Sequence, residues 1–186
     1  SIVFDMNLPL KNLNRQFDTI IDFGTSEHIF NVTQSLQNVS DLCKKDETNF
    51  SYLCLGISES SNTKALFKRA KKLNVKYIED NEMNFSYIEK IKNKIDKFLK
   101  IKRYIYITID TDVFSSYILS SVSAPASKGI SLEITYEILK YLFENYKKRI
   151  KLLDVTEFNP KYDDNNQGAK IVSRLIYDIV KFKDRY

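Results

Sequence analysis

One apolar run near the middle of the chain, Tyr104–Asp112 (YIYITIDTD), constrains the fold most strongly, because it is strand-like and ends in two closely spaced carboxylates. Side chains alternate between the two faces of a strand, so Thr108, Asp110 and Asp112 are expected to share one face. In open parallel sheets, ligands bind beyond the carboxyl ends of the strands. We therefore expect both carboxylates to converge on one ligand site at such an edge.

Strand-like and helix-like patterns alternate along the sequence. Apolar runs predict strands at 17–23, 52–57, 75–79, 104–112 and 150–156, and helical spacing predicts helices at 29–44, 61–73, 87–99, 131–146 and 171–180. Strand and helix units in succession favour an α/β fold with a mostly parallel sheet and helices on both faces. The length of 186 residues suits one domain, so we predict a single α/β domain spanning residues 1–186.

Composition argues against several classes of partner. The lysines behind the formal net charge of +5 are spread over several predicted helices, as is typical of solvated faces, so no nucleic-acid partner is expected. No apolar run approaches membrane-spanning length, so no membrane partner is expected. The two cysteines, Cys43 and Cys54, make no disulfide framework, which favours a reducing, cytoplasmic location.

Carboxylates follow two successive predicted strands. Asp110 and Asp112 offer oxygen ligands suited to Mg²⁺ or Mn²⁺, although such a pair can also end a strand and cap a turn. Glu157 follows the next strand, and two neighbouring parallel strands would bring it near the aspartates, unless it is an ordinary capping or surface acid. Between them lies the small-residue loop 121–126 (SVSAPA), in which Ser123 could present its hydroxyl to a polar substrate.

Three segments in this order, ITIDTDVF, VSAPASKGIS and LLDVTEFNPKYD, resemble the C-terminal half of the ureohydrolases, which are the arginases, agmatinases and, most closely, formimidoylglutamases. The resemblance extends upstream through FSYLCLGISESSNT and VKYIEDNEMN, and covers about Asn49 to Phe182. It implies a three-layer α/β/α fold and a binuclear Mn²⁺ centre that activates water to attack an amidine or guanidine carbon. For the formimidoylglutamase branch, it implies hydrolysis of N-formimidoyl-glutamate to glutamate and formamide, in histidine degradation.

The same resemblance assigns roles to individual residues. Asp110 and Asp112 match the second aspartate pair of the family, in which the first aspartate bridges the metals. Glu157 matches the glutamate that holds the cationic nitrogen end of the substrate. Asp110 and Glu157 are therefore the predicted catalytic residues, and Glu157, Ser123 and Asn159 the predicted contacts of a small-molecule amidine substrate. Members of the family commonly assemble into homo-oligomers, so a homo-oligomer is also expected.

The chain departs from the family pattern at several positions. Four of the six protein ligands of the family come from a glycine-rich segment ending in His and from an Asp-Ala-His-x-Asp strand end, and the single histidine, His28, matches neither. We therefore expect an incomplete metal site and little activity from this chain alone, with an inactive remnant or subunit as the alternative. Ser120–Ser121 also replaces the usual Pro-Gly, and Gln167–Gly168 the usual Thr-Ala.

The N-terminal stretch has a different resemblance. Residues Phe17–Leu42 are similar to the middle of class I S-adenosylmethionine-dependent methyltransferases, although the glycine-rich cofactor loop that should precede them is missing. We therefore predict a foreign strand-helix segment over residues 1–44, joined to a ureohydrolase-like portion over 49–186. A methyltransferase fragment is a distant alternative for the function, and His28 is expected to begin a helix rather than bind a ligand.

Overall fold

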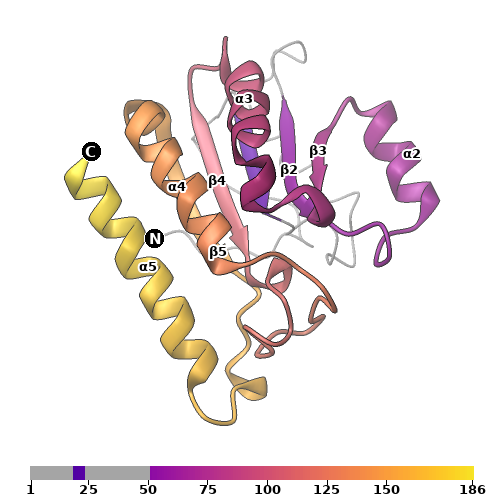
Figure 1. Cartoon of the computed structure of the whole chain (residues 1–186), viewed down its shortest axis with the longest axis vertical. Coiled ribbons are helices and arrows are strands. Elements are labelled where there is room, and N and C mark those ends of the chain that lie inside the picture. Colours follow the sequence, from indigo (N-terminus) through magenta and orange to yellow (C-terminus); the bar gives the residue numbers. More distant parts are fainter. Residues whose placement is uncertain (1–18, 24–50) are drawn as a thin grey trace, which may run out of the picture.

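A parallel β-sheet organises the computed structural model, which describes residues 19–23 and 51–186 (Figure 1). Its order is β3-β2-β1-β4-β5, and every pairing is parallel. The strands are β1 (Thr19–Phe23), β2 (Tyr52–Ile57), β3 (Lys76–Glu79), β4 (Ile105–Asp110) and β5 (Ile150–Thr156). The predicted strands are thus confirmed to within a few residues, and the strand drawn from the N-terminal stretch lies in the middle of the sheet.

Four helices connect or follow the strands in the described part of the chain: α2 (Lys64–Lys72), α3 (Ile88–Leu99), α4 (Leu132–Tyr146) and α5 (Gln167–Arg185). Figure 1 shows α3, α4 and α5 in front of the sheet, with α2 beyond β3. The predicted helix at 29–44 and residue His28 lie outside the described residues. None of the described helices is long and apolar enough to cross a membrane.

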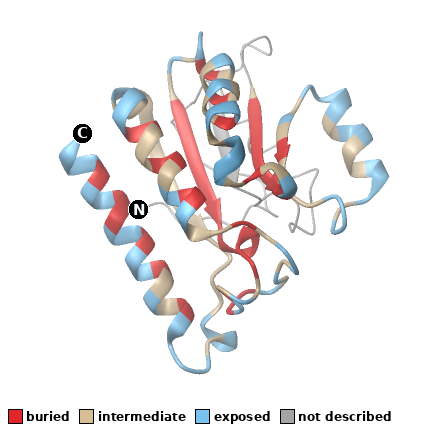
Figure 2. Cartoon of the chain, in the orientation of Figure 1, coloured by how far each residue is buried: buried red, intermediate tan, exposed pale blue. Residues whose placement is uncertain are grey.

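The helical periodicity in the sequence arises from burial on the sheet. The inner stripes of α3, α4 and α5 form one apolar cluster with the front of β4, which contributes Ile105, Ile107 and Ile109 (Figure 2). All residues of β4 are buried, so this strand is enclosed on both faces. At about 25 cal/mol per Å² of apolar surface, burial of such side chains is the main term that stabilises the fold. The apolar run thus buries β4 up to its last residue, Asp110.

Candidate metal and substrate site

The carboxyl ends of β4 and β5 lie side by side. Asp110, the last residue of β4, pairs in register with Thr156, the last residue of β5. The hydroxyl of Thr111 donates a hydrogen bond to the Thr156 carbonyl at 2.8 Å, which fastens the two strand ends together. Glu157 follows directly. The structure therefore brings the chain positions of the three predicted acids to one edge of the sheet.

The aspartate pair is held in a tight turn and not along one strand. The strand ends at Asp110, and Thr111–Val113 form a 3₁₀ turn, so the expectation of a strand reaching Asp112 is wrong. The cause is local, because the Asp110 Oδ1 accepts a hydrogen bond from the Asp112 backbone N–H at 2.8 Å and caps the turn. Both carboxylates are fully buried. The sequence left open whether Asp110 caps a turn or binds a metal ion. The two roles are compatible in this residue.

The chemistry of this pair suits a hard divalent cation. Burying ionised carboxylates costs several kcal/mol each unless positive charge or hydrogen bonds compensate, and Asp110 and Asp112 lie within one turn. Oxygen donors of this kind fit Mn²⁺ or Mg²⁺. However, among residues 51–186 no group of three or more His, Cys, Asp or Glu side chains is placed to hold a metal ion. The described residues fit the metal in donor type but supply too few ligands for a complete centre.

Backbone register adds one acidic position that the sequence reasoning passed over. Asp22 of β1 pairs with Thr108 of β4, two residues before Asp110 on the neighbouring strand. The signal was present in the sequence, since the next-to-last residue of β1 and the last residue of β4 are both acids. It was missed because that stretch was interpreted as part of a different kind of protein.

Glu157 has an unusual backbone conformation. Its φ of 66° lies in the left-handed region, which costs roughly 1 kcal/mol or more for a residue that is not glycine. The residue does not cap the 3₁₀ turn that follows, because Asn159 does so by accepting a hydrogen bond from the Lys161 N–H at 3.0 Å. Backbone strain of this kind concentrates at functional sites. The half-buried Glu157 is therefore poorly explained as an ordinary capping acid.

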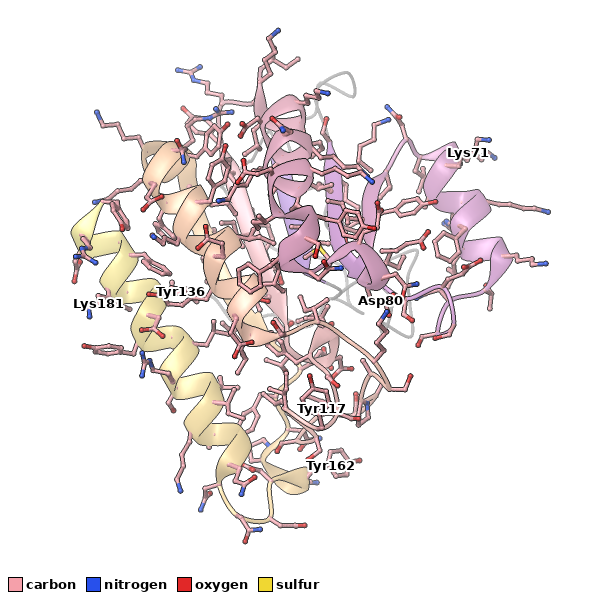
Figure 3. All side chains as sticks on the ribbon, in the orientation of Figure 1. Lys71, Asp80, Tyr117, Tyr136, Tyr162 and Lys181 are labelled. Atoms are coloured by element: carbon pink, nitrogen blue, oxygen red, sulfur yellow. The ribbon has the colours of Figure 1, made fainter. Side chains whose placement is uncertain are left out.

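The other two predicted substrate contacts, Ser123 and Asn159, differ in their surroundings. Asn159 is half-buried, and its amide oxygen already caps the turn, while its backbone N–H donates to the Ser121 carbonyl at 2.8 Å. Ser123 is exposed in the neighbouring loop. Tyr117 and Tyr162, two exposed tyrosines from the segments after β4 and β5, lie at the same end of the sheet (Figure 3). The loop after β4 and the turn after β5 thus form the rim of the candidate site.

Hydrogen bonds to Asp163 hold this loop against helix α5 and form a latch that the sequence did not predict. The Ser121 hydroxyl donates to Asp163 Oδ1 at 3.0 Å, and the Asp163 carboxylate accepts the backbone N–H groups of Gly168 and Ala169 at 2.9 and 2.8 Å. Partial desolvation raises the pKa of Asp163, but these amide and hydroxyl donors outweigh it and hold the pKa below its ordinary value. Asp163 thus caps α5 and anchors the loop that carries Ser123.

The two departures from the family pattern contact each other. A Cβ added to Gly168 would lie 2.4 Å from the Ser121 Oγ, 2.7 Å from the Ser121 Cβ and 3.0 Å from Phe158. The family resemblance predicts a glycine at the first position and an alanine at the second, whereas this chain has the larger Ser121 and the smaller Gly168. The exchange conserves the total volume at a close contact. The small Gly168 thus leaves room for the Ser121 side chain at the start of α5.

A sequence model of the arginase family matches residues 16–181. The chain belongs to the arginase family. It is 35% identical to the formimidoylglutamase of Aliivibrio fischeri over 182 residues, which are 96% of this chain and 52% of that protein. Arginase-family membership thus rests on nearly the whole sequence, while the chain spans only about half the length of this relative.

Solved structures support the arginase-type fold. The formimidoylglutamase of Bacillus subtilis superposes with a TM-score of 0.74 at 20% identity, over 89% of this chain and 53% of that one. The Trypanosoma cruzi formiminoglutamase, solved with Mn²⁺, gives 0.68 at 13% identity, over 88% and 54% of the two chains. The fold is therefore the three-layer α/β/α fold implied by the sequence resemblance.

The family match also bears on the N-terminal stretch. It begins at residue 16 and so includes residues 17–42, most of which lie outside the described part of the chain. Within it, β1 pairs with β2 on one side and with β4 on the other. Strand β1 therefore takes a central place in an arginase-family sheet, and the boundary near residue 44 stays a prediction.

Proposed function

We propose that this chain is the site-bearing portion of a manganese-dependent hydrolase of linear amidines, with N-formimidoyl-glutamate as substrate and glutamate and formamide as products. The observation that carries the proposal is the register of Asp110 with Thr156, which sets a buried aspartate pair beside Glu157 at one edge of a parallel sheet. The named formimidoylglutamase relative and the family match support the same substrate class.

Each residue has a distinct proposed task. Asp110 and Asp112 would hold Mn²⁺. The bound ion would lower the pKa of water and stabilise the negative charge that develops on the substituents of the attacked amidine carbon. The carboxylate of Glu157 binds the cationic amidine nitrogens by charge-assisted hydrogen bonds, each worth about 1.5–3 kcal/mol. The Ser123 hydroxyl and the Asn159 side-chain amide orient the rest of the substrate from the rim. The latch through Asp163 keeps this rim in place.

A second candidate, an inactive subunit or remnant, is favoured by one observation. The described residues hold no group of three or more potential metal ligands, so residues 51–186 supply only part of a two-metal centre. We therefore propose that the 186-residue chain alone turns over little or no substrate. The chain would then contribute to catalysis only when the remaining metal ligands are supplied.

A chimera with the Aliivibrio fischeri formimidoylglutamase tests the function. Residues 49–182 of this chain would replace the matching region of that enzyme, and formamide release from N-formimidoyl-glutamate would be measured with Mn²⁺. We expect turnover that Glu157→Gln lowers at least about tenfold in kcat/KM, with a melting temperature close to that of the parent chimera. A folded, Mn²⁺-binding chimera without turnover, or one indifferent to Glu157→Gln, would refute the proposal.

The same design tests the predicted boundary. A second chimera would carry residues 16–182, which include the stretch interpreted as foreign. If that stretch has lost metal ligands, the longer insert abolishes turnover while the shorter one keeps it. Equal activity of the two chimeras would show that the segment belongs functionally to the arginase family, and the boundary near residue 44 would be wrong.

A further inference from the structure

A polar pocket lies between the turn that follows β3 and the loop that follows β4. Its volume of about 430 Å³ is typical of small-molecule pockets. Asp80 and Tyr117, labelled in Figure 3, come from the two segments that enclose it. None of the residues proposed to bind Mn²⁺ or the amidine substrate lines this pocket. It is therefore a separate space, and the proposed reaction gives it no use.

Backbone contacts hold the wall that comes from the loop after β4. The Ser116 backbone N–H donates a hydrogen bond to the Ala126 carbonyl at 2.8 Å. Gly129 has a φ of 59°, and a Cβ added to it would lie 2.4 Å from the Ser115 backbone nitrogen. Glycine therefore lets the two halves of the loop approach closely. This wall is preformed, which lowers the entropy cost of binding a ligand.

One acid in the pocket lacks a counterpart. Asp80 is only 7% exposed, and within the described residues its carboxylate has no hydrogen-bond or ion-pair partner. The Ser115 Oγ, from another lining residue, is buried and likewise has no hydrogen-bond partner in this part of the chain. Burying an unpartnered carboxylate or hydroxyl costs free energy, which a bound cation that donates hydrogen bonds would recover. These two groups therefore favour a ligand with an ammonium group.

A cation lines the same pocket but does not pair with this acid. Lys128 is exposed, and its Nζ donates a hydrogen bond to Asn81 Oδ1, which ties the lysine to the turn after β3. An ammonium group has three donors, so others remain for a ligand. Within residues 51–186, Lys128 and Asp80 form no ion pair with each other, although both line the pocket. Two opposite charges held apart in one cavity match a ligand that carries both charges.

Apolar side chains complete the pocket. Met83 and Ile130 are buried along it, and the exposed Phe85 also lines it. We propose that this pocket binds a free α-amino acid in its zwitterionic form. The ammonium group of the ligand bonds to Asp80 and its carboxylate to Lys128, through charge-assisted hydrogen bonds. An aliphatic side chain packs on Met83 and Ile130. This inference goes beyond the proposed function and does not depend on it.

A nuclear magnetic resonance titration of the 186-residue chain with L-leucine tests the pocket. We expect saturable shifts of the backbone amides within residues 80–85 and 127–131. N-acetyl-L-leucine lacks the ammonium charge and L-leucinamide lacks the carboxylate, so each should bind at least about tenfold more weakly than L-leucine. Shifts confined to residues 110–112 and 156–159 would place L-leucine in the candidate substrate site and would overturn the proposal.

Two variants that remove a charge assign each end of the ligand. Asp80→Asn should weaken binding of L-leucine at least about tenfold but should not weaken binding of N-acetyl-L-leucine, which has no ammonium charge for Asp80 to hold. Lys128→Gln should weaken binding of L-leucine to a similar extent but not binding of L-leucinamide, which has no carboxylate. Lys100→Gln, on an exposed lysine outside the pocket, is the control and should leave the affinity for L-leucine unchanged.

Each other outcome overturns the proposal. No saturable shift with L-leucine would show that the pocket takes no such amino acid. Equal affinity for L-leucine and the two blocked analogues, or binding unaffected by Lys128→Gln, would show that the two charges do not select the ligand. Because Lys128 is exposed, its variant decides the question even if Asp80→Asn lowers the melting temperature.

Discussion

The contact between Ser121 and Gly168 allows a quantitative test of how the site loop is held. Gly168→Ala would place a methyl group 2.4 Å from the Ser121 Oγ and 2.7 Å from the Ser121 Cβ. Rotation of the hydroxyl could relieve the first contact only by breaking its bond to Asp163, and the second requires the loop backbone to move. The clash is therefore expected to unfasten the loop from α5.

The size of the effect follows from opposing contributions. Overpacking costs typically about 1–3 kcal/mol, whereas alanine in place of glycine in a helix returns up to about 1 kcal/mol. With overpacking near the middle of its range, about 2 kcal/mol, the expected net loss is about 1–2 kcal/mol, which corresponds to a decrease of roughly 2–8 °C in the melting temperature for a chain of this length. Thermal unfolding followed by circular dichroism at 222 nm measures it, and proteolysis of the loop reports its release.

Compensating changes at Ser121 separate this mechanism from a general helix effect. In the Gly168→Ala background, Ser121→Ala removes only the Oγ contact and should restore part of the stability, while Ser121→Gly removes both contacts and should restore most of it. The coupling energy between Gly168→Ala and Ser121→Gly should reach at least about 1 kcal/mol. Additive effects of the two substitutions, or a stabilising Gly168→Ala alone, would refute the reasoning.

Two further predictions concern buried or capping acids. The pKa of Asp163 is lowered on folding, so its contribution to stability is present above its ordinary value of 3.8 and is lost as the pH falls through the lowered folded value. Asp163→Asn should therefore lower the melting temperature at pH 7, and the gap to the parent chain should narrow below about pH 4; a constant gap from pH 7 to 3 would contradict this. The pKa of Asp154 is raised by burial, against hydrogen bonds from Thr108 and Tyr106, so its charged form is penalised at neutral pH. Asp154→Asn should gain stability relative to the parent at pH 7, and this advantage should shrink as the pH falls toward 3.8; an advantage that grows on acidification would be inconsistent with a raised pKa.

The sequence predicted the sheet well because apolar side chains recur with a different period in strands and in helices. Isoleucines at alternate positions in β4 predicted a buried strand, and the stripe of α5 predicted a helix packed on one side, both of which the structure contains. The end of β4 was placed less well. The cap formed by Asp110 turns the chain before Asp112, and a strand pattern alone does not reveal that bond.

The candidate site was predictable only where it follows from single segments or from the shared edge of neighbouring parallel strands. The acids after β4 and β5 could be paired because parallel strands share an edge. The latch through Asp163 joins residues 42 positions apart in the chain, and no local pattern reports such a contact. Asp22 was passed over because its stretch resembles a different kind of protein, and its position beside β4 follows only from the strand order.

Manganese binding by the 186-residue chain tests the aspartate pair most directly. Mn²⁺ would be titrated into the chain and into the Asp110→Asn and Asp112→Asn variants, with free Mn²⁺ followed by electron paramagnetic resonance and stability by the melting temperature. We expect the parent chain to bind Mn²⁺ and to gain stability from it in proportion to RT ln(1 + [Mn²⁺]/Kd), and both variants to lose the binding and the gain. Equal binding by the variants, or no binding by the parent chain, would contradict a metal site at the end of β4.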